Sequence, residues 1–599
     1  MDYVAVKQAR HPAYRPLDQH TKEIRLLDVI PSVNEADSVR CDVLHKSLNS
    51  HDSHEYETIS YAWGASKDRR TIVLNDVPLP VPIESERALR RMRLSDKYRT
   101  LWIDSVCINQ VDGDERSQQV AIMSDIYRSS NGNLIYLGDE DGLVGPAVEN
   151  MNLIYEEMRL WTNDFTVARS VLYYAEEGLQ RELRHSEESL GVRLNLEAFT
   201  DLIGRPCRLW VLQEAALAPA NRCYAGRHEF DLLLVLRVAA WLYIHRTSLT
   251  AELSWNTGFQ NVIMLFVYAD HQYGLFGKKT RKAFSDLLYA SSLRQTTDPR
   301  DRVFGMLGLL GQLPDSCRDA SHLLSPDYQK HVAEVQRDAT RYIILEDNAL
   351  NILALIDHSE TSLALDACSW AVRLVKGKKG SAEPNPLLWG QFHAANGRVV
   401  DPRLVLPDTG FDDPRVLSLL GMVSDVVIET GEVLAPEVYH SAETVERALC
   451  TVEELTSRRT TLSTEDMFRV LVTDIGARRE QLGARREQLT DSEAQQMAAS
   501  WKSCKDSRPP GPKNLRSHIG KFAWHRRVFT TAKGALGLGP ALTVAGDLIT
   551  VLDGGALPFV LRPEKSSYRV VGACYVHGIM HGTDVQGGEE GEKQIFDLR

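Results

Sequence analysis

Polar and aromatic residues follow three apolar runs in the N-terminal third of the chain. From the segments ISYAWG, LWIDSVCINQ and IYLGDE they are Ser60, Tyr61, Trp63, Gly64, Asp104, Asn109, Gln110, Gly138 and Asp139. Carboxylate and amide groups could bind ribose hydroxyls, and aromatic rings could stack on a base. In the alternative interpretation, Asp104 and Asn109 cap the next helix while Tyr61 and Trp63 pack in the core.

A second candidate is the carboxylate of Glu214 in the segment LWVLQEAAL, 209–217. Helical spacing places this glutamate beside an apolar face formed by Leu209, Leu212, Ala216 and Leu217. A carboxylate in such a place is either an ion-pair partner, here of Arg205 or Arg208, or a functional acid whose pKa is tuned by burial.

The elements that must position these residues alternate between strand and helix. Strands are expected at 24–31, 57–64, 71–81, 100–108 and 133–138, and helices at 84–94 and from 115 onwards. Asp112 and Asp114 stand at the start of the second helix, where carboxylates suit free backbone amides. This order predicts a doubly wound α/β sheet, in which ligand-binding groups lie beyond the carboxyl ends of the strands.

Four regions are predicted along the 599 residues. Residues 1–225 form the α/β domain, and 226–449 form a mainly helical region. Residues 450–515 form a charged helical connector that contains the tandem heptapeptide GARREQL, and Gly-rich turns between short apolar runs predict a small β-rich domain at 516–599.

Composition and charge exclude several classes of protein. Lys and Arg total 69 against 81 Asp and Glu, a net charge of -12, and no basic segment is interleaved with stacking aromatics, so no nucleic acid is expected as a partner. The longest apolar run, 232–244, is shorter than the roughly 17 residues that span a bilayer and contains Arg237, so we expect a buried helix and no membrane span.

Cysteine usage and the first residues of the sequence indicate a reducing compartment. The nine cysteines are scattered singly without a CxxC pair, which favours reduced thiols in the cytosol or nucleus. The opening segment MDYVAVKQARHPAYRPLDQH has no apolar core, so we expect no secretory signal.

Three further motifs favour structural roles. GALGLGP lacks the ending of a phosphate-binding loop, so turn glycines are expected there. Cys574, His577 and His581 have ligand-like spacing but no second ligand pair, so no metal is assigned. DPRDRVFG, 298–305, alternates acids and arginines before an apolar helix, which favours capping and ion pairing over substrate contact.

These segments resemble the fungal HET-domain family, named for heterokaryon incompatibility. The resemblance runs through ETISYAWG, LWIDSVCINQ, QVAIMSDIYRSS, RLWVLQE, and DPRDRVFGMLGLL followed by PDY at 326–328. The run from GALGLGP to YVHGIMHG resembles the closing segment of many full-length members. The family implies an intracellular protein that takes part in non-self recognition after cell fusion and triggers regulated cell death.

The HET domain in turn resembles the TIR domain in its order of elements, so the resemblance implies a TIR-like doubly wound sheet. In enzymatic TIR domains a glutamate shortly after a tryptophan serves NAD cleavage, and Glu214, four residues after Trp210, matches it by position. This chain departs from the family at Arg205 and Pro206, where two aromatic residues often stand.

The resemblance implies an NAD glycohydrolase in which Glu214 is catalytic, NAD is the substrate and no cofactor is required. The residues that would hold the ligand are Tyr61, Trp63, Gly64, Asp104, Asn109 and Gln110. The alternative is a non-enzymatic TIR-like module that recruits a partner, and a third interpretation is an accessory protein without a death function. We expect a cytoplasmic protein that self-associates or binds an incompatibility partner.

Overall fold

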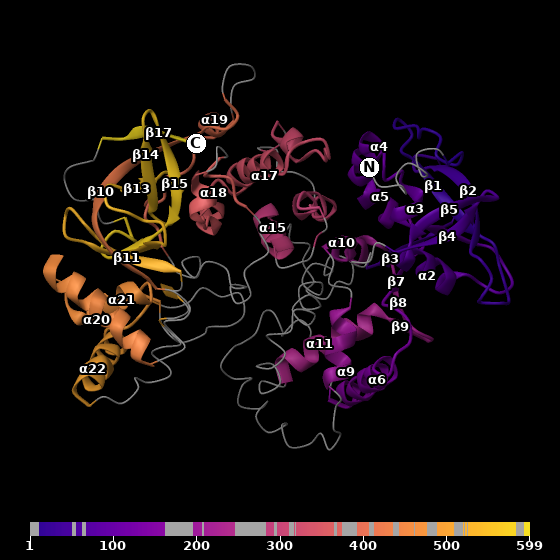
Figure 1. Cartoon of the computed structure of the whole chain (residues 1–599), viewed down its shortest axis with the longest axis horizontal. Helices are drawn as coiled ribbons and strands as arrows, with labels where there is room; N and C mark the ends of the chain where they lie inside the picture. Colours follow the sequence, from indigo (N-terminus) through magenta and orange to yellow (C-terminus); the bar gives the residue numbers. More distant parts are fainter. Residues whose placement is uncertain are drawn as a thin grey trace. The chain divides into compact units, whose positions relative to one another are not determined.

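A computed structural model of the chain is shown in Figure 1. It describes residues 11–50, 55–62, 68–161, 196–205, 209–245, 283–292, 296, 298–310, 317, 319–364, 368–373, 392–406, 413–434, 442–459, 462–475, 488–507, 519, 522–523, 525–582 and 592–599. The chain forms two compact units. The first comprises Met1–Lys282, Asp286–Gln312 and Ser325–His331, and the second comprises Ala283–Ser285, Leu313–Leu324 and Val332–Arg599.

A mixed β-sheet forms the base of the first unit. Its strands among the described residues are β1 (Glu23–Val29), β2 (Arg40–Ser47), β3 (Glu57–Tyr61), β4 (Arg69–Leu74), β5 (Val77–Pro82), β6 (Arg99–Trp102), β7 (Gly132–Tyr136), β8 (Asn221–Ala225) and β9 (His228–Asp231). Their order in the sheet is β5-β4-β2-β1-β6-β3-β7-β8-β9. Strands β6, β3, β7 and β8 are parallel, so their carboxyl ends lie at one edge.

Helices accompany these strands in the first unit. They are α2 (Ile83–Met92), α3 (Asp104–Cys107), α4 (Gly113–Ala121), α5 (Met123–Arg128), α6 (Val144–Trp161), α9 (Leu196–Gly204), α10 (Leu209–Leu217), α11 (Leu232–His245), α16 (Asp301–Phe304) and the 3₁₀ turn η2 (Leu307–Leu309). Strand β3 is flanked by β6 on one side and by β7, which follows β6 along the chain, on the other. The predicted N-terminal α/β sheet is confirmed, with its topological switch point between β3 and β7.

The strand expected at 100–108 is shorter in the structure. It ends at Trp102, and Asp104–Cys107 form one helical turn, α3. The turn forms because the Asp104 carboxylate accepts the Ser105 backbone N–H at 2.7 Å, while the Cys107 N–H bonds to the carbonyl of Ile103 at 2.8 Å. A short polar side chain thus competes with the strand for backbone hydrogen bonds.

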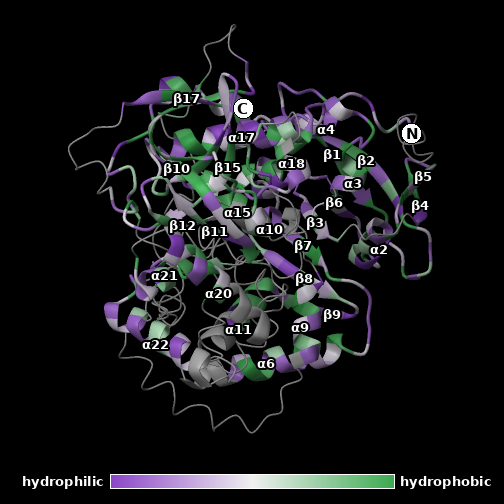
Figure 2. Cartoon of the chain, turned by 60° about the vertical axis from the view of Figure 1, so that its left-hand side comes forward, coloured by the Kyte–Doolittle hydropathy of each residue, from purple (hydrophilic) through white to green (hydrophobic). Residues whose placement is uncertain are grey.

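One apolar core connects the sheet of the first unit to its helices. Buried side chains from β1, β3, β6 and β7 meet those of α2 and α5, and hydrophobic residues, green in Figure 2, occur on both strands and helices. At its centre, the rings of Trp102 and Tyr127 meet edge to face with centroids 5.6 Å apart. This packing fixes the end of β6 against α5.

The second unit contains a small β-barrel. Its strands are β10 (Leu417–Leu434), β11 (Arg526–Thr531), β12 (Leu536–Pro540), β13 (Leu548–Leu552), β14 (Phe559–Glu564), β15 (Ser567–Ala573), β16 (Tyr575–Val576) and β17 (Gln594–Leu598). The order is β13-β14-β15-β17-β10-β11-β12-β16, and β10 also pairs with β13. That extra pairing closes a ring of five described strands, β13-β14-β15-β17-β10. The expectation of a β-rich C-terminal domain is confirmed.

Strand β10 differs from the mainly helical region expected at 226–449. This 18-residue strand lies inside that range and pairs with β11, β13 and β17. Its sequence, LSLLGMVSDVVIETGEVL, is rich in β-branched residues, which favour strands, and two glycines disfavour a helix. Register shifts next to Val423, Val427 and Thr430 bend the strand. Its first part therefore pairs with β17 and β13, and its second part pairs with β11.

Helices complete the second unit and the junction before it. They are α15 (Phe284–Ser292), η4 (Ser321–Leu324), α17 (Val332–Asp347), η5 (Asn351–Leu355), α18 (Glu360–Ala364), α19 (Pro402–Val405), α20 (Ala442–Arg459), α21 (Thr464–Leu471) and α22 (Asp491–Ser507). Most of the GARREQL repeat, at 476–487, lies outside the described residues.

The glycines of GALGLGP divide between a turn and a strand. Gly534 has a φ of 84° and serves the expected turn. Gly537 and Gly539 instead lie in β12, where a side-chain carbon at either position would overlap the ring of Phe529. These two glycines therefore allow close packing rather than a turn.

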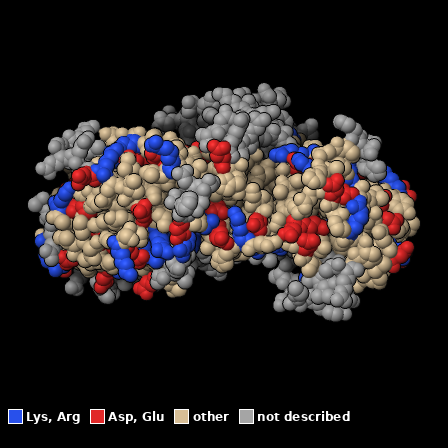
Figure 3. Space-filling view, turned by 90° about the horizontal axis from the view of Figure 1, so that it is seen from above, with Lys and Arg blue, Asp and Glu red and all other residues tan. Residues whose placement is uncertain are grey.

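Acidic and basic side chains are interspersed on the face of the molecule shown in Figure 3. Among the described residues, none of the helices combines the length and the apolar character needed to cross a membrane.

Candidate functional site

Glu214 lies in a buried polar cluster at the carboxyl edge of the parallel strands. Helix α10, which carries it, packs against β3 and α5. Glu214 is only 4% exposed, and its carboxyl group interacts with Asp104, Ser60 and Tyr127. These partners come from the turn after β6, the end of β3 and α5, so three elements converge on one side chain.

Burial and a second carboxylate hold Glu214 largely protonated near neutral pH. Removal of the carboxyl group from water is the main cause, and the negative charge of Asp104 is the next; together they raise the pKa of Glu214 to about 8. The neighbouring polar side chains of Ser60 and Tyr127 act in the opposite direction and lower the pKa. The site thus contains an acid that can exchange a proton near physiological pH.

Tyr61 belongs to the same cluster. Its hydroxyl lies 2.9 Å from the hydroxyl of Ser85 on α2, and the Ser105 hydroxyl donates to that of Ser85 at 2.9 Å. Burial raises the pKa of Tyr61 well above its usual value, and the charges of Asp104 and Glu214 add to this shift. The structure therefore brings together four of the residues singled out from the sequence: Ser60, Tyr61, Asp104 and Glu214.

Tyr127, Ser85 and Ser105 are polar members of the cluster that the sequence did not single out. Tyr127 falls on the apolar face expected for its helix, while Ser85 and Ser105 are buried serines that stand next to acidic residues in the sequence. The only sequence pattern that could have indicated these three residues is a polar group at a buried position of a helix. Ordinary core packing produces the same pattern, so it does not identify a site.

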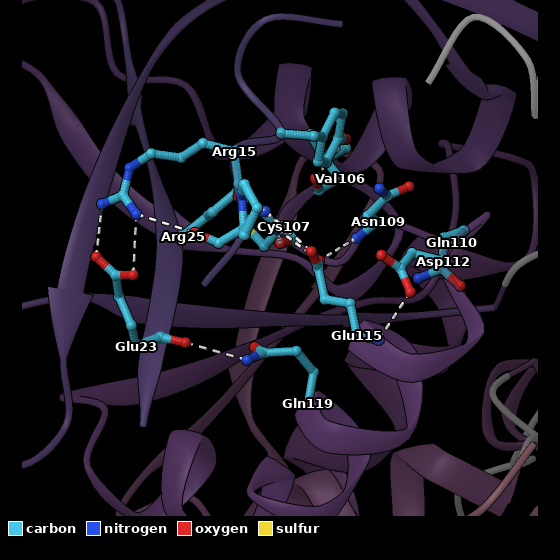
Figure 4. Close-up of polar contacts among 12 residues, drawn as sticks. Arg15, Glu23, Arg25, Val106, Cys107, Asn109, Gln110, Asp112, Glu115 and Gln119 are labelled. Carbon is cyan, nitrogen blue, oxygen red and sulfur yellow. Dashed lines mark hydrogen bonds and ion pairs between the residues drawn. The ribbon is translucent and has the colours of Figure 1, made fainter. Parts of the chain in front are cut away.

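Asn109 and Gln110 lie between α3 and α4, close to Asp112 and Glu115 (Figure 4). The Asn109 backbone N–H donates to the Glu115 carboxylate at 2.7 Å, and its side-chain oxygen accepts the Val111 N–H at 3.3 Å. The Gln110 side chain donates to the carbonyl of Asp104 at 2.9 Å. Both residues shape the backbone that presents Asp104.

A buried ion pair holds this turn in place (Figure 4). Arg25 on β1 donates twice to Glu115, at 2.6 and 3.0 Å, and once to the carbonyl of Cys107 at 3.1 Å. Asp112 caps α4 by accepting the backbone N–H groups of residues 114 and 115. The guanidinium of Arg25 therefore ties the last residue of α3 to the first turn of α4.

Arg205 makes its ion pairs away from Glu214. Its guanidinium pairs with Asp201 at 2.6 Å and also with Asp141. Among the described residues Glu214 forms no ion pair, which distinguishes it from the buried Glu115. Of the other residues named from the sequence, Trp63, Gly64, Pro206 and Arg208 lie outside the described residues.

The end of β7 carries a separate, more exposed contact. The Tyr136 hydroxyl donates to Asp139 at 2.5 Å, and Arg87 lies 3.4 Å from the same carboxylate. Gly138 has a φ of 109°, which suits glycine at this bend.

No group of three or more His, Cys, Asp or Glu side chains within the described part of the chain could hold a metal ion. His577 lies 3.6 Å from Asp466, and the Cys574 thiol, whose pKa is raised by burial to about 12, lies 3.6 Å from the Pro558 carbonyl.

Two family models match this chain. Residues 56–214 match the model described as heterokaryon incompatibility protein (HET), and residues 446–596 match the Het-6 beta-barrel domain. The first match covers the strands and turns of the cluster and ends at Glu214. The chain thus contains a region similar to the HET family, followed by a region similar to the Het-6 beta-barrel domain.

The chain is also similar to the Neurospora crassa protein named heterokaryon incompatibility protein 6, OR allele. The two are 24% identical over 674 aligned positions, which cover 94% of this chain and 95% of the relative. Together with the family models, this similarity supports a heterokaryon incompatibility protein. No solved structure matches the chain, so the TIR likeness stays a prediction.

Proposed function

We propose that this chain is a heterokaryon-incompatibility effector that takes part in non-self recognition and regulated cell death, and that it acts by cleaving the nicotinamide–ribose bond of NAD. The two domain matches and the similarity along most of the chain support the incompatibility role. The chemistry is our extension of that role and rests on the cluster around Glu214.

The observation that carries the chemistry is a buried glutamate that forms no ion pair within the described residues and lies next to a second carboxyl group. Burying such an acid costs stability, because the protein must either strip water from a charge or keep the group protonated. Groups held in this way are concentrated at functional sites, where a perturbed pKa serves the reaction.

The residues present suit glycosidic bond cleavage. Loss of neutral nicotinamide leaves an oxocarbenium-like ribose, and an ionised Glu214 beside that sugar would stabilise the positive charge. Water then adds to the same ribose carbon and releases a proton, which leaves ADP-ribose as the second product. Asp104 would add negative charge and bind ribose hydroxyls. Tyr61 would lie beside the ligand, while Asn109 and Gln110 would act indirectly by holding the turn of Asp104. No cofactor is required for this step, because NAD is itself the substrate.

A non-enzymatic interaction module is the alternative, and the 4% exposure of Glu214 favours it. A catalytic carboxylate must reach its substrate, so an enzyme would have to open this cluster. We propose that self-association, or binding of an incompatibility partner, provides that opening, and that the protein acts in the cytoplasm. No disulfide joins the cysteines that the structure describes.

The test is to incubate the purified full chain with NAD at increasing protein concentration and to measure nicotinamide release by chromatography. We expect release by the unmodified chain and its loss in Glu214→Gln. Glu229→Gln is the matched control, because Glu229 pairs with Arg222 in an exposed position on β8 and β9. Two results together would establish the interaction module instead. The unmodified chain would release no nicotinamide at any concentration, and the Glu214→Gln variant would be as toxic to cells as the unmodified chain.

A further inference from the structure

A segment that follows Glu214 by more than eighty residues packs directly against the helix that carries it. Helix α16 and the turn η2 both contact α10, and η2 also contacts α5. All four elements belong to the first compact unit, although the sequence between α11 and α16 separates them. The cluster is thus covered by residues outside the predicted 1–225 domain.

Gly308 is the closest point of this contact. A side-chain carbon at 308 would lie 2.1 Å from Nε2 and 2.8 Å from Cδ of Gln213, and 3.0 Å from Cβ of Ser124. Gln213 is buried and precedes Glu214 in α10. Arg128 on α5 donates to the Gly308 carbonyl at 2.8 Å, so a hydrogen bond also holds the backbone at this position. A side chain at 308 would therefore require the buried end of Gln213 to move.

Tyr328 anchors the segment to the sheet domain. Its ring contacts two guanidinium groups. The ring centroid lies 3.8 Å from Cζ of Arg116 and 5.3 Å from Cζ of Arg300. Its hydroxyl donates to Asp301 at 2.6 Å, and its backbone N–H donates to the hydroxyl of Ser117 on α4 at 3.1 Å. One aromatic residue therefore joins α16 to α4.

Ion pairing completes the anchor. Arg300 pairs with Asp298 at 2.7 Å and also donates to the carbonyls of Tyr328 and Lys330. The alternating acids and arginines of DPRDR thus bind their own segment and the loop around Tyr328. Their charges are satisfied inside the first unit, which agrees with the structural role expected for this motif.

We propose that residues 298–310, anchored by Tyr328, form a positioning segment for Glu214, with Gly308 as the point at which the segment fixes α10. The functional unit accordingly extends beyond residue 225 to His331. This inference rests on the proposed function of Glu214, but the contact itself can be tested without substrate.

The experiment uses the full chain and two readouts, hydrogen exchange of the α10 amides and NAD cleavage as a function of pH. In Gly308→Ala the new methyl group displaces Gln213, so we expect α10 to exchange about tenfold faster and cleavage to fall with a shifted pH midpoint. Gly113→Ala is the matched control, because a side-chain carbon at 113 meets nothing within 4 Å.

A double variant separates positioning from general damage. Gln213→Ala removes both Gln213 atoms that the new methyl group would overlap, so Gly308→Ala/Gln213→Ala should restore the slow exchange of α10. Tyr328→Phe, which keeps the ring in contact with the guanidinium groups but loses the bond to Asp301, should give a smaller effect than Tyr328→Ala. Unchanged α10 exchange in both Gly308→Ala and Tyr328→Ala would overturn the inference.

The two proposals fail in different ways. If the unmodified chain releases no nicotinamide but α10 exchanges faster in the variants, the cleavage chemistry is wrong and the positioning of α10 holds. If Glu214→Gln abolishes cleavage while neither Gly308→Ala nor Tyr328→Ala changes the exchange of α10, Glu214 is catalytic and the positioning segment is wrong.

Discussion

Arg25 and Glu115 form an ion pair inside the first unit, with Nη1 of the arginine 2.6 Å from Oε1 of the glutamate and only 1% and 8% of the two side chains exposed. The pair joins β1 to α4 and reaches the turn that presents Asp104. Two charges removed from water in this way are costly unless every hydrogen bond is made, so the pair is a sensitive point of the fold.

Replacing Glu115 by Ala should destabilise the first unit strongly. The change leaves Arg25 buried without its partner, and we expect a loss of about 3–5 kcal/mol in the free energy of unfolding, measured with urea. Asp76→Asn is the control, because it breaks an exposed pair with Arg40 and should cost less than about 1 kcal/mol. Equal losses in the two variants would contradict the importance of burial.

The barrel of the second unit offers a test of close packing. In Gly537→Ala the new carbon would lie 2.3 Å from Cζ of Phe529 on the paired strand, and we expect a loss of about 1–3 kcal/mol from overpacking. Gly431→Ala on β10 should be nearly neutral, because the nearest atoms there are 3.6 and 3.7 Å away. Thermal unfolding of both variants measures the difference, and similar midpoints would refute it.

The sequence predicted those parts of the site that depend on local pattern. Alternating strands and helices placed Tyr61 and Asp104 at strand ends, and parallel pairing of β3 with β6 brings those ends to one edge. The cap by Asp112 was also predicted, since a carboxylate before a helix has a local cause.

The parts that the sequence did not predict depend on contacts between distant residues. Nothing near Gly308 indicates that its backbone meets Gln213, and nothing near Tyr127 indicates that its hydroxyl interacts with a glutamate 87 residues later. Strand β10 was missed although its β-branched residues and two glycines favour a strand, because its partners β13 and β17 lie far along the chain.

Glu214→Gln should stabilise the protein increasingly as pH rises. The pKa of Glu214 is about 8 in the folded chain, against the usual 4.5 of a glutamate in water, so between these values the folded state holds a proton that unfolding releases. The stability supplied by this group is complete below about pH 4.5 and is lost as pH rises towards 8.

Urea unfolding of the unmodified chain and of Glu214→Gln at pH 5, 6, 7 and 8 measures this effect. The glutamine keeps the shape of the side chain without titrating, so the difference between the two proteins should widen with pH by on the order of a few kcal/mol. A difference that stays constant across this range would show that Glu214 titrates normally.

Asp104→Asn should move the pH profile of NAD cleavage to lower pH. Cleavage needs ionised Glu214, so activity should rise as pH approaches about 8, and the negative charge of Asp104 is one cause of that high pKa. Removing the charge should lower the midpoint by up to about one pH unit. Asp139→Asn is the control, because this more exposed carboxylate interacts with Tyr136 and Arg87 and should leave the midpoint in place. Should Asp104→Asn lower the rate equally at every pH, Asp104 binds substrate without setting the ionisation of Glu214.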